Sequence, residues 1–499
     1  MSWIDISDLS FTYQGAAEPV FENLSVRLDT DWRLGLIGRN GRGKTTLLRL
    51  LMGMQADSGR ISTSAEFDYF PFPVPDRELT GGEVAQTLRP GLEEWRLRKE
   101  MASLNLEEGM LFRSFRTLSN GEQTRFLLAL LFAQEGKFLL IDEPTNHLDL
   151  EGREIVARYL AQKKGFLLVS HDRAFLDRSV DHILAFNRFG LEVQKGNFSS
   201  WWENKERREQ FEQAEQEKLK GEIKRLDQAA RQTAAWSDST EQAKKGTRNS
   251  GLRPDRGYIG HKAAKMMKRS KSVQARRENA AEAKAKLLHN VETTEPLKIH
   301  PLTHPQTRLA EVRDLEVNYG SGPVCRGVSF TVEQGERVAL RGANGAGKSS
   351  ILKLLLGEEI PHTGQVRMAS GLVISYVPQD SSFLQGNLED FSRENKLDES
   401  LFKAILRKLD FSREQFDLDM GDYSAGQKKK VLLACSLCTS AHLYLWDEPL
   451  NYVDLWSRMQ LEELLTGREI TLVLIEHDQA FTDRVASKAV ELKRLAHRL

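Results

Sequence analysis

The chain has 499 residues, too many for one hydrophobic core, so we expect two or three domains. Hydrophobic residues make up 40% and charged residues 28%, which is typical of a soluble globular protein and excludes a disordered one. The net charge is zero, from 71 basic and 71 acidic side chains, so the total charge gives no information about partners.

The N-terminal residues "MSWIDISDLS" lack the basic-then-apolar plan of a signal peptide. The longest apolar runs, such as "FLLALLF", are far shorter than the roughly 18 residues that span a bilayer. Cys325, Cys435 and Cys438 are too few for a disulfide framework. The CxxC spacing of "CSLC" lies in an apolar helical run, which favours core thiols over zinc ligands. We therefore expect a cytoplasmic protein with no membrane part.

An internal repeat organises the chain. "GLIGRNGRGKTTLLRLL" returns as "ALRGANGAGKSSILKLL", "LSNGEQTRFLLALLF" as "YSAGQKKKVLLACSL", "LLIDEPTNHLDL" as "LYLWDEPLNYVDL", and "FLLVSHDRAFLDR" as "TLVLIEHDQAFTDR". Corresponding residues lie about 305 positions apart throughout. Four motifs in one order and register indicate a tandem duplication with an insert between the copies.

Each copy opens with an alternating stretch that predicts a strand, "IDISDLSFTY" or "LAEVRDLEVNY". A further strand, a glycine-rich loop and an apolar helical run follow. In that setting GxxxxGK[ST] predicts a phosphate-binding loop, and it occurs at residues 38–45 and 342–349. Backbone N–H groups can close around phosphate oxygens there, at a helix N-terminus whose dipole favours anions. We expect Lys44 and Lys348 to reach the terminal phosphates.

Downstream, "FLLIDEP" and "LYLWDEP" predict buried parallel strands that end in two carboxylates. The oxygens expected to hold Mg²⁺ belong to Thr45, Asp142, Ser349 and Asp447. Glu143 and Glu448 are expected to polarise the attacking water as general bases. A strand end turning into a loop would explain one such pair. Two pairs at matched distance from a phosphate loop favour catalysis.

These motifs resemble the ATP-binding cassette superfamily, and the resemblance covers both copies. "LSNGEQ" and "YSAGQ" look like its signature motif, which offers a serine and a glycine to the γ-phosphate bound by the opposite cassette. His171 and His477 resemble the catalytic switch histidine, and Asp149 and Asp454 the D-loop aspartate. The nucleotide-binding residues that the resemblance implies are Tyr13, Gly38, Asn40, Gly41, Gly43, Lys44, Thr45, Thr46, Ser119 and Gly121, with Tyr319, Gly342, Asn344, Gly345, Gly347, Lys348, Ser349, Ser350, Ser424 and Gly426.

The two tyrosines in this list have a second interpretation, and one further motif differs between the copies. Tyr13 and Tyr319 precede their loops where the family stacks an aromatic ring on adenine, but core aromatics are also common at strand ends. "YVPQD" supplies Gln379 where the family uses a glutamine to sense metal and water, so the resemblance implies Gln379 as a further metal ligand. The matching "YFPFP" has Phe72, so the first site lacks that ligand. We therefore expect two composite ATP sites of unequal activity.

Two such cassettes could act on one of three kinds of target: a membrane transporter, DNA or chromosomes, or the ribosome. Transporter cassettes normally carry a longer helical segment between phosphate loop and signature than the 75 and 76 residues found here. The zinc modules or very long coiled coils of DNA-repair cassettes are not visible.

The insert, residues 196–305, begins with a stretch rich in Glu, Gln, Lys and Ala. Some 45 such residues predict one exposed helix of roughly 65–70 Å. A second helix, "IGHKAAKMMKRSKSVQARRENAAEAKAKLLHNV", is expected to run back antiparallel, with the turn at about 246–258. Residues 241–280 hold 12 Lys or Arg and 3 Asp or Glu. On charge alone, a solvated helix and a polyanion-binding surface explain this equally well.

Tandem cassettes, a long helical linker and no membrane part resemble the ABC-F family, as does "GNFSSWW" at the start of the linker. The resemblance implies an α/β fold with two tandem cassettes of the P-loop NTPase fold, joined by a long antiparallel two-helix linker. The implied domains are 1–195, 196–305 and 306–499. It also implies a monomer that pairs its own cassettes, hydrolyses ATP with Mg²⁺ in the bacterial cytosol, and binds no DNA.

In ABC-F proteins the cassettes close in the E site of the 70S ribosome, and the linker reaches P-site tRNA and the peptidyl-transferase centre of 23S rRNA. The short first cassette and "DEPLNYVD" look most like the antibiotic-resistance branch, especially its Lsa- and Vga-type members. That likeness implies protection against lincosamides, pleuromutilins and streptogramin A. A housekeeping factor that rescues stalled ribosomes and the ATPase subunit of an exporter stay open as alternatives.

The turn of the linker would face RNA or the drug site. Its candidate residues are Arg248, Leu252, Arg253, Arg256, Tyr258, Ile259 and Lys262. Aromatic stacking on an unstacked base is a common mode of RNA binding. An apolar cluster that only holds the turn together would explain Leu252, Tyr258 or Ile259 equally well.

Overall fold

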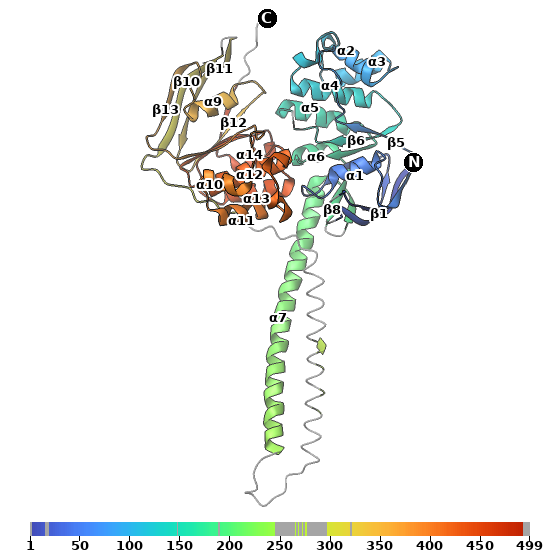
Figure 1. Cartoon of the computed structure of the whole chain (residues 1–499), viewed down its shortest axis with the longest axis vertical. Coiled ribbons are helices and arrows are strands. Elements are labelled where there is room, and N and C mark those ends of the chain that lie inside the picture. Colours follow the sequence, from blue (N-terminus) through green and yellow to red (C-terminus); the bar gives the residue numbers. More distant parts are fainter. Residues whose placement is uncertain are drawn as a thin grey trace, which may run out of the picture. The chain divides into compact units, whose positions relative to one another are not determined.

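A computed structural model of the chain describes residues 2–14, 19–146, 148–187, 190–244, 297–319 and 322–492, with five isolated positions between 265 and 276. The chain forms two compact units (Figure 1). The first comprises Met1–Trp201 and Thr294–Leu499 and contains both copies of the repeat; the second is Trp202–Thr293.

Two sheets form the first cassette. A three-stranded antiparallel sheet has the order β2-β1-β4, and a six-stranded sheet has the order β5-β6-β7-β3-β8-β9. Their strands are β1 Trp3–Phe11, β2 Phe21–Asp29, β3 Arg33–Ile37, β4 Ser58–Thr63, β5 Glu66–Phe70, β6 Lys137–Asp142, β7 Phe166–Val169, β8 His182–Asn187 and β9 Gly190–Lys195. The central strands pair in parallel, so their sequences are nearly continuous apolar runs buried on both faces.

Helices surround this sheet and follow the order of the predicted motifs. They are α1 Lys44–Leu51, α2 Gly81–Leu88, α3 Glu94–Ser103, α4 Asn120–Phe132, α5 Leu150–Ala161 and α6 Arg173–Ser179, with short 3₁₀ helices at Glu108–Phe112 and Phe115–Thr117. Each motif lies where a strand or loop meets one of these helices.

The second cassette repeats this plan, with sheets of order β11-β10-β13 and β14-β15-β16-β12-β17. Its strands are β10 Arg308–Asn318, β11 Pro323–Glu333, β12 Arg337–Gly342, β13 His362–Met368, β14 Ile374–Val377, β15 Leu443–Asp447, β16 Leu472–Ile475 and β17 Lys488–Leu492. Its helices are α9 Lys348–Leu355, α10 Leu388–Glu394, α11 Glu399–Lys408, α12 Ala425–Cys438, α13 Leu455–Thr466 and α14 Gln479–Val485, with 3₁₀ helices at Glu414–Asp417 and Met420–Asp422. The predicted fold of two tandem cassettes is confirmed.

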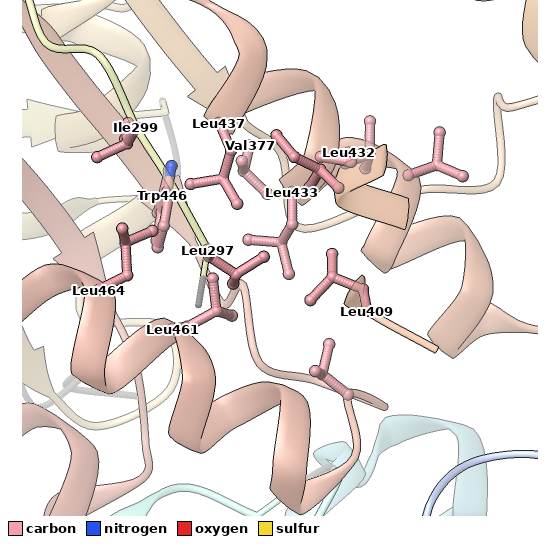
Figure 2. Close-up of a cluster of buried hydrophobic side chains, with 14 of the residues drawn as sticks. Leu297, Ile299, Val377, Leu409, Leu432, Leu433, Leu437, Trp446, Leu461 and Leu464 are labelled. Carbon is pink, nitrogen blue, oxygen red and sulfur yellow. The ribbon is translucent and has the colours of Figure 1, made fainter. Parts of the chain in front are cut away.

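A large apolar cluster anchors the chain where it enters the second cassette (Figure 2). Leu297 and Ile299 are buried beside Trp446 of β15 and the leucines of α12 and α13. The segment before β10 is therefore part of the cassette core.

The linker opens with the predicted long helix, α7, which runs over Phe198–Lys244. Its 47 residues correspond to about 70 Å at 1.5 Å per residue. The predicted turn, with all seven of its candidate residues, lies outside the described residues, and so does the predicted second helix apart from the five isolated positions. Among the described helices, none is both long and apolar enough to cross a bilayer.

Candidate ATP-binding sites

The first phosphate loop joins β3 to α1. Gly43 has φ +85° at the start of α1, a left-handed conformation that favours glycine. The Lys44 ammonium curls back over the loop and donates to the carbonyl oxygens of Gly38 (2.8 Å) and Arg39 (3.1 Å). The loop therefore surrounds a buried cation, and burial lowers the pKa of Lys44.

The second phosphate loop, between β12 and α9, has the same geometry. Gly347 has φ +86°, and the Lys348 ammonium donates to the carbonyls of Gly342 (2.7 Å) and Ala343 (3.0 Å). Burial lowers the pKa of Lys348 too, so in both loops a lysine is desolvated where a phosphate could replace its carbonyl partners.

The predicted metal-binding side chains come together at the ends of β6 and β15. In the first cassette the Thr45 hydroxyl donates to Asp142 Oδ2 at 3.0 Å. In the second, Asp447 accepts a hydrogen bond from Ser349, and its Oδ1 is buried with no partner among the described residues. Carboxylate and hydroxyl oxygens are the ligands Mg²⁺ prefers, so both sets fit that cation.

The two glutamates that follow these aspartates have different surroundings. Glu448 Oε2 accepts from Gln379 Nε2 at 2.9 Å and from Asn451 Nδ2 at 2.6 Å. Its Oε1 lies 3.5 Å from His477 Nε2. Burial opposes ionisation of Glu448, but His477 and the two amides outweigh it and lower its pKa to about 2.

Glu143 lacks this support. Its Oε1 lies 3.3 Å from His171 Nε2, yet neither oxygen has a well-aligned hydrogen-bond donor in the described part of the chain. Burial, followed by the charge of Asp142, raises the pKa of Glu143 to about 8. One glutamate is therefore held ionised, and the other favours its protonated form near neutral pH.

Each signature serine begins a helix. Ser119 caps α4 and Ser424 caps α12, and in both cases the serine and the residue three positions later bond reciprocally. A cavity of about 750 Å³ is lined by both Ser119 and Gly121 of the first cassette and by Lys348, Ser349 and Glu448 of the second. The first signature therefore shares a cavity with the second phosphate loop.

The second signature approaches the first phosphate loop in the same way. A Cβ on Gly426 would lie 3.1 Å from Asn40 Nδ2 and 2.4 Å from the Tyr452 carbonyl oxygen. Asn40 Nδ2 donates to that carbonyl at 3.0 Å. The Tyr452 carbonyl of the same cassette leaves room only for glycine, and the bond from Asn40 brings the first phosphate loop into direct contact with the second cassette beside it.

The D-loop aspartates differ between the sites. Asp149 caps α5 and accepts a 3.4 Å hydrogen bond from the Asn344 backbone across the cassettes. Asp454 is fully buried and forms a 2.5 Å ion pair with Lys430. The two predicted adenine-stacking tyrosines remain accessible; Tyr13 bonds the Thr46 hydroxyl and Tyr319 the Ser350 hydroxyl, both at 2.9 Å.

Sequence reasoning missed several side chains at these sites. Tyr69 donates to Asp142 at 3.1 Å, and Asn451 supports Glu448. Lys429 and Lys430 are buried, although the run "KKK" would be placed in solvent on composition. Aligning the two copies of the repeat could have singled out these lysines, because Lys429 aligns with Thr124 and Lys430 aligns with Arg125.

The fold and these sites together define an ATP-binding cassette protein with two cassettes. The family described as "ABC transporter" matches residues 21–146 and 325–451. The ATP-binding protein Uup of Caulobacter vibrioides is 29% identical over 95% of this chain and 75% of its own length. The ribosome protection protein VmlR of Bacillus subtilis is 28% identical over 95% and 84%. The erythromycin resistance ATP-binding protein MsrA of Staphylococcus epidermidis is 28% identical over 92% of both chains.

Solved structures agree on the fold. An archaeal ribosome recycling factor, aABCE1, superposes with a TM-score of 0.59 at 20% identity, covering 97% of this chain and 87% of its own. The chain belongs to the ABC transporter family and, with the relatives above, to its ABC-F type of two-cassette ATP-binding proteins. The family's ATP-binding domains imply nucleotide binding and ATPase activity.

Proposed function

We propose that this protein is a ribosome-binding ATPase that protects the large subunit against antibiotics of the peptidyl-transferase centre. The proposal rests mainly on how much of the chain is similar to VmlR. The alignment includes 95% of this chain and so extends through the linker as well as the cassettes. We assign residues 1–195 and 306–499 to the cassettes and 196–305 to the linker.

ATP would bind at two composite sites, each built from the phosphate loop of one cassette and the signature helix of the other. The shared lining of the 750 Å³ cavity supports this arrangement for the second site. The contact of Asn40 with Tyr452 supports it for the first. Mg²⁺, held by Thr45 with Asp142 and by Ser349 with Asp447, would neutralise phosphate charge when bound.

The second site is proposed to hydrolyse ATP faster. Glu448 is ionised, and Gln379 and Asn451 hold its carboxylate, so it can accept a proton from an attacking water. His477 lies beside it and would contact the γ-phosphate. Glu143 tends to keep its own proton near neutral pH, and Phe72 stands where Gln379 stands in the second site, so the first site binds ATP and hydrolyses it slowly.

On the ribosome the cassettes would close on ATP in the E site, and the linker would reach P-site tRNA and the peptidyl-transferase centre. Its lysines and arginines would meet rRNA phosphates. The turn, through residues such as Tyr258, would disturb the site of lincosamides, pleuromutilins or streptogramin A directly or through rearranged RNA. Hydrolysis would then reopen the cassettes and release the protein into the cytoplasm.

Drug susceptibility of a bacterial host tests this proposal. Cells expressing the unaltered chain should become resistant with no fall in cellular drug content, and cells expressing E143Q/E448Q should not. A fall in drug content would favour an exporter subunit. Unchanged susceptibility to every class, combined with translation arrest by the double variant, would favour a housekeeping factor.

Co-sedimentation with 70S ribosomes tests the step before protection. With ATP present, E143Q/E448Q should pellet with ribosomes more completely than the unaltered chain, because it cannot hydrolyse the nucleotide that closes the cassettes. If the double variant stays in the supernatant at every ATP concentration, both ribosomal functions are excluded.

A further inference from the structure

A buried lysine joins the signature helix of the second cassette to the loop that carries Gln379. Lys429 lies on α12 and is only 2% exposed to solvent. Its ammonium donates to the carbonyl oxygens of Pro378 (2.7 Å), Gln379 (3.1 Å) and Asp447 (3.3 Å). One side chain thus fastens the loop after β14 to the end of β15.

These three bonds lie directly behind the catalytic pair. Gln379 donates its side-chain amide to Glu448, the residue after Asp447. Lys429 therefore holds the main chain of both the donor and the residue next to the acceptor. A shift of either backbone would lengthen the 2.9 Å bond between Gln379 and Glu448.

Stability alone does not account for a lysine at this position. Taking an ammonium out of water is costly, and burial lowers the pKa of Lys429 to about 8 despite the nearby charge of Asp447. In the first cassette the same helix position is Thr124, which is also buried, and the fold is the same. There the loop carries Phe72, which has no amide to aim at a glutamate.

We propose that Lys429 is a positioning residue for ATP hydrolysis at the second site, acting through Gln379 on Glu448. The inference rests on the proposed function, in which the second site hydrolyses ATP. It goes further in assigning a role to a residue behind the site that is not among those lining the 750 Å³ cavity.

The test is a double-mutant cycle between K429M and Q379A in an E143Q background, which confines hydrolysis to the second site. Methionine keeps the apolar stem of Lys429 and removes its three donors. We expect K429M to lower kcat about tenfold, with KM for ATP unchanged within about twofold. Because Lys429 acts through Gln379, adding K429M to Q379A should lower kcat no further.

K403M is the matched control, because Lys403 binds Glu389 and Glu399 on the surface of the same cassette, at 3.0 and 2.6 Å. It should leave kcat unchanged. A kcat of K429M equal to that of the background protein would overturn the inference, and so would independent, multiplying effects of K429M and Q379A.

Folding is checked separately by the thermal unfolding midpoint of each variant. If K429M does not fold, K429T, which introduces the residue of the first cassette, replaces it with the same expected loss of kcat. If the E143Q protein itself shows no turnover above E143Q/E448Q, the proposed second-site hydrolysis fails, and this inference fails with it.

Discussion

At the scale of single residues, the two glutamates show what a motif does and does not fix. The sequence places Glu143 and Glu448 in identical "DEP" contexts, and Phe72 opposite Gln379 predicts that the sites differ. It does not reveal that Asn451 donates to Glu448, whereas among the described residues neither Asn146, at the same position of the first cassette, nor any other side chain gives Glu143 a well-aligned donor. Which side chains reach a carboxylate depends on the folded structure around it, and the motif alone does not specify that.

Separate glutamine variants should therefore slow ATP turnover unequally. Loss of an ionised, well-held general base typically costs about 10²-fold or more. We expect E448Q to lower kcat by about that factor and E143Q by less than about threefold, because Glu143 contributes little as a base when protonated. Steady-state phosphate release measures both, and equal losses would contradict the assignment.

The raised pKa of Glu143 also predicts a pH-dependent stability. Between pH 4.5 and about 8 the folded chain binds more protons at Glu143 than the unfolded chain does. Its contribution to the free energy of unfolding therefore falls as pH rises through that range. E143Q removes this loss, so its thermal midpoint relative to the unaltered protein should be higher at pH 8 than at pH 5.

E448Q is the control for that measurement. The folded-state pKa of Glu448 is about 2, so its stabilising contribution is complete above its ordinary value and constant between pH 5 and 8. The midpoint difference between E448Q and the unaltered protein should not change over this interval. An E143Q difference that is also flat would show that Glu143 ionises normally.

At the scale of elements, the motifs predicted the order of strand, loop and helix in both cassettes and the long helix α7. They did not predict the bulges of β1 and β10, where pairing shifts near Asp8 and Asp314. Both aspartates have φ close to +50°. A two-residue alternation marks a strand, but an inserted residue is set by how the strand bends over its partner.

The start of α7 has a packing role that predicts a large loss of stability. Trp201 is 2% exposed, and its ring meets Trp456 of α13 edge-on at 6.5 Å between centroids. Deleting a buried tryptophan typically costs about 3–5 kcal/mol, so W201A should lower the free energy of unfolding by that amount.

Its neighbour supplies the control. Trp202 is only partly buried, and its indole donates to Glu206 within the same helix at 2.7 Å. W202A should cost less than about 1 kcal/mol. Denaturant titration measures both variants, and similar losses would mean that Trp201 does not anchor the helix.

At the scale of the whole molecule, duplication suggests equivalent halves, but the contacts between the cassettes are unequal. Arg173, beside the switch of the first cassette, donates to buried Glu462 of α13, which also binds Arg484 at 2.7 Å. In the repeat, Arg173 aligns with Gln479 of the second cassette, and Glu462 aligns with Ala157 of the first. Comparing the repeats could reveal these substitutions, but not which residues meet, because that depends on the packing of the two cassettes.

Cell-free translation in the presence of a lincosamide tests the central claim most directly, since no membrane is present and export cannot contribute. We predict that the unaltered protein with ATP restores synthesis in proportion to its concentration. E143Q/E448Q, which closes without reopening, should inhibit synthesis with or without drug. Continued inhibition by the lincosamide when the unaltered protein is present in excess over ribosomes would contradict ribosome protection.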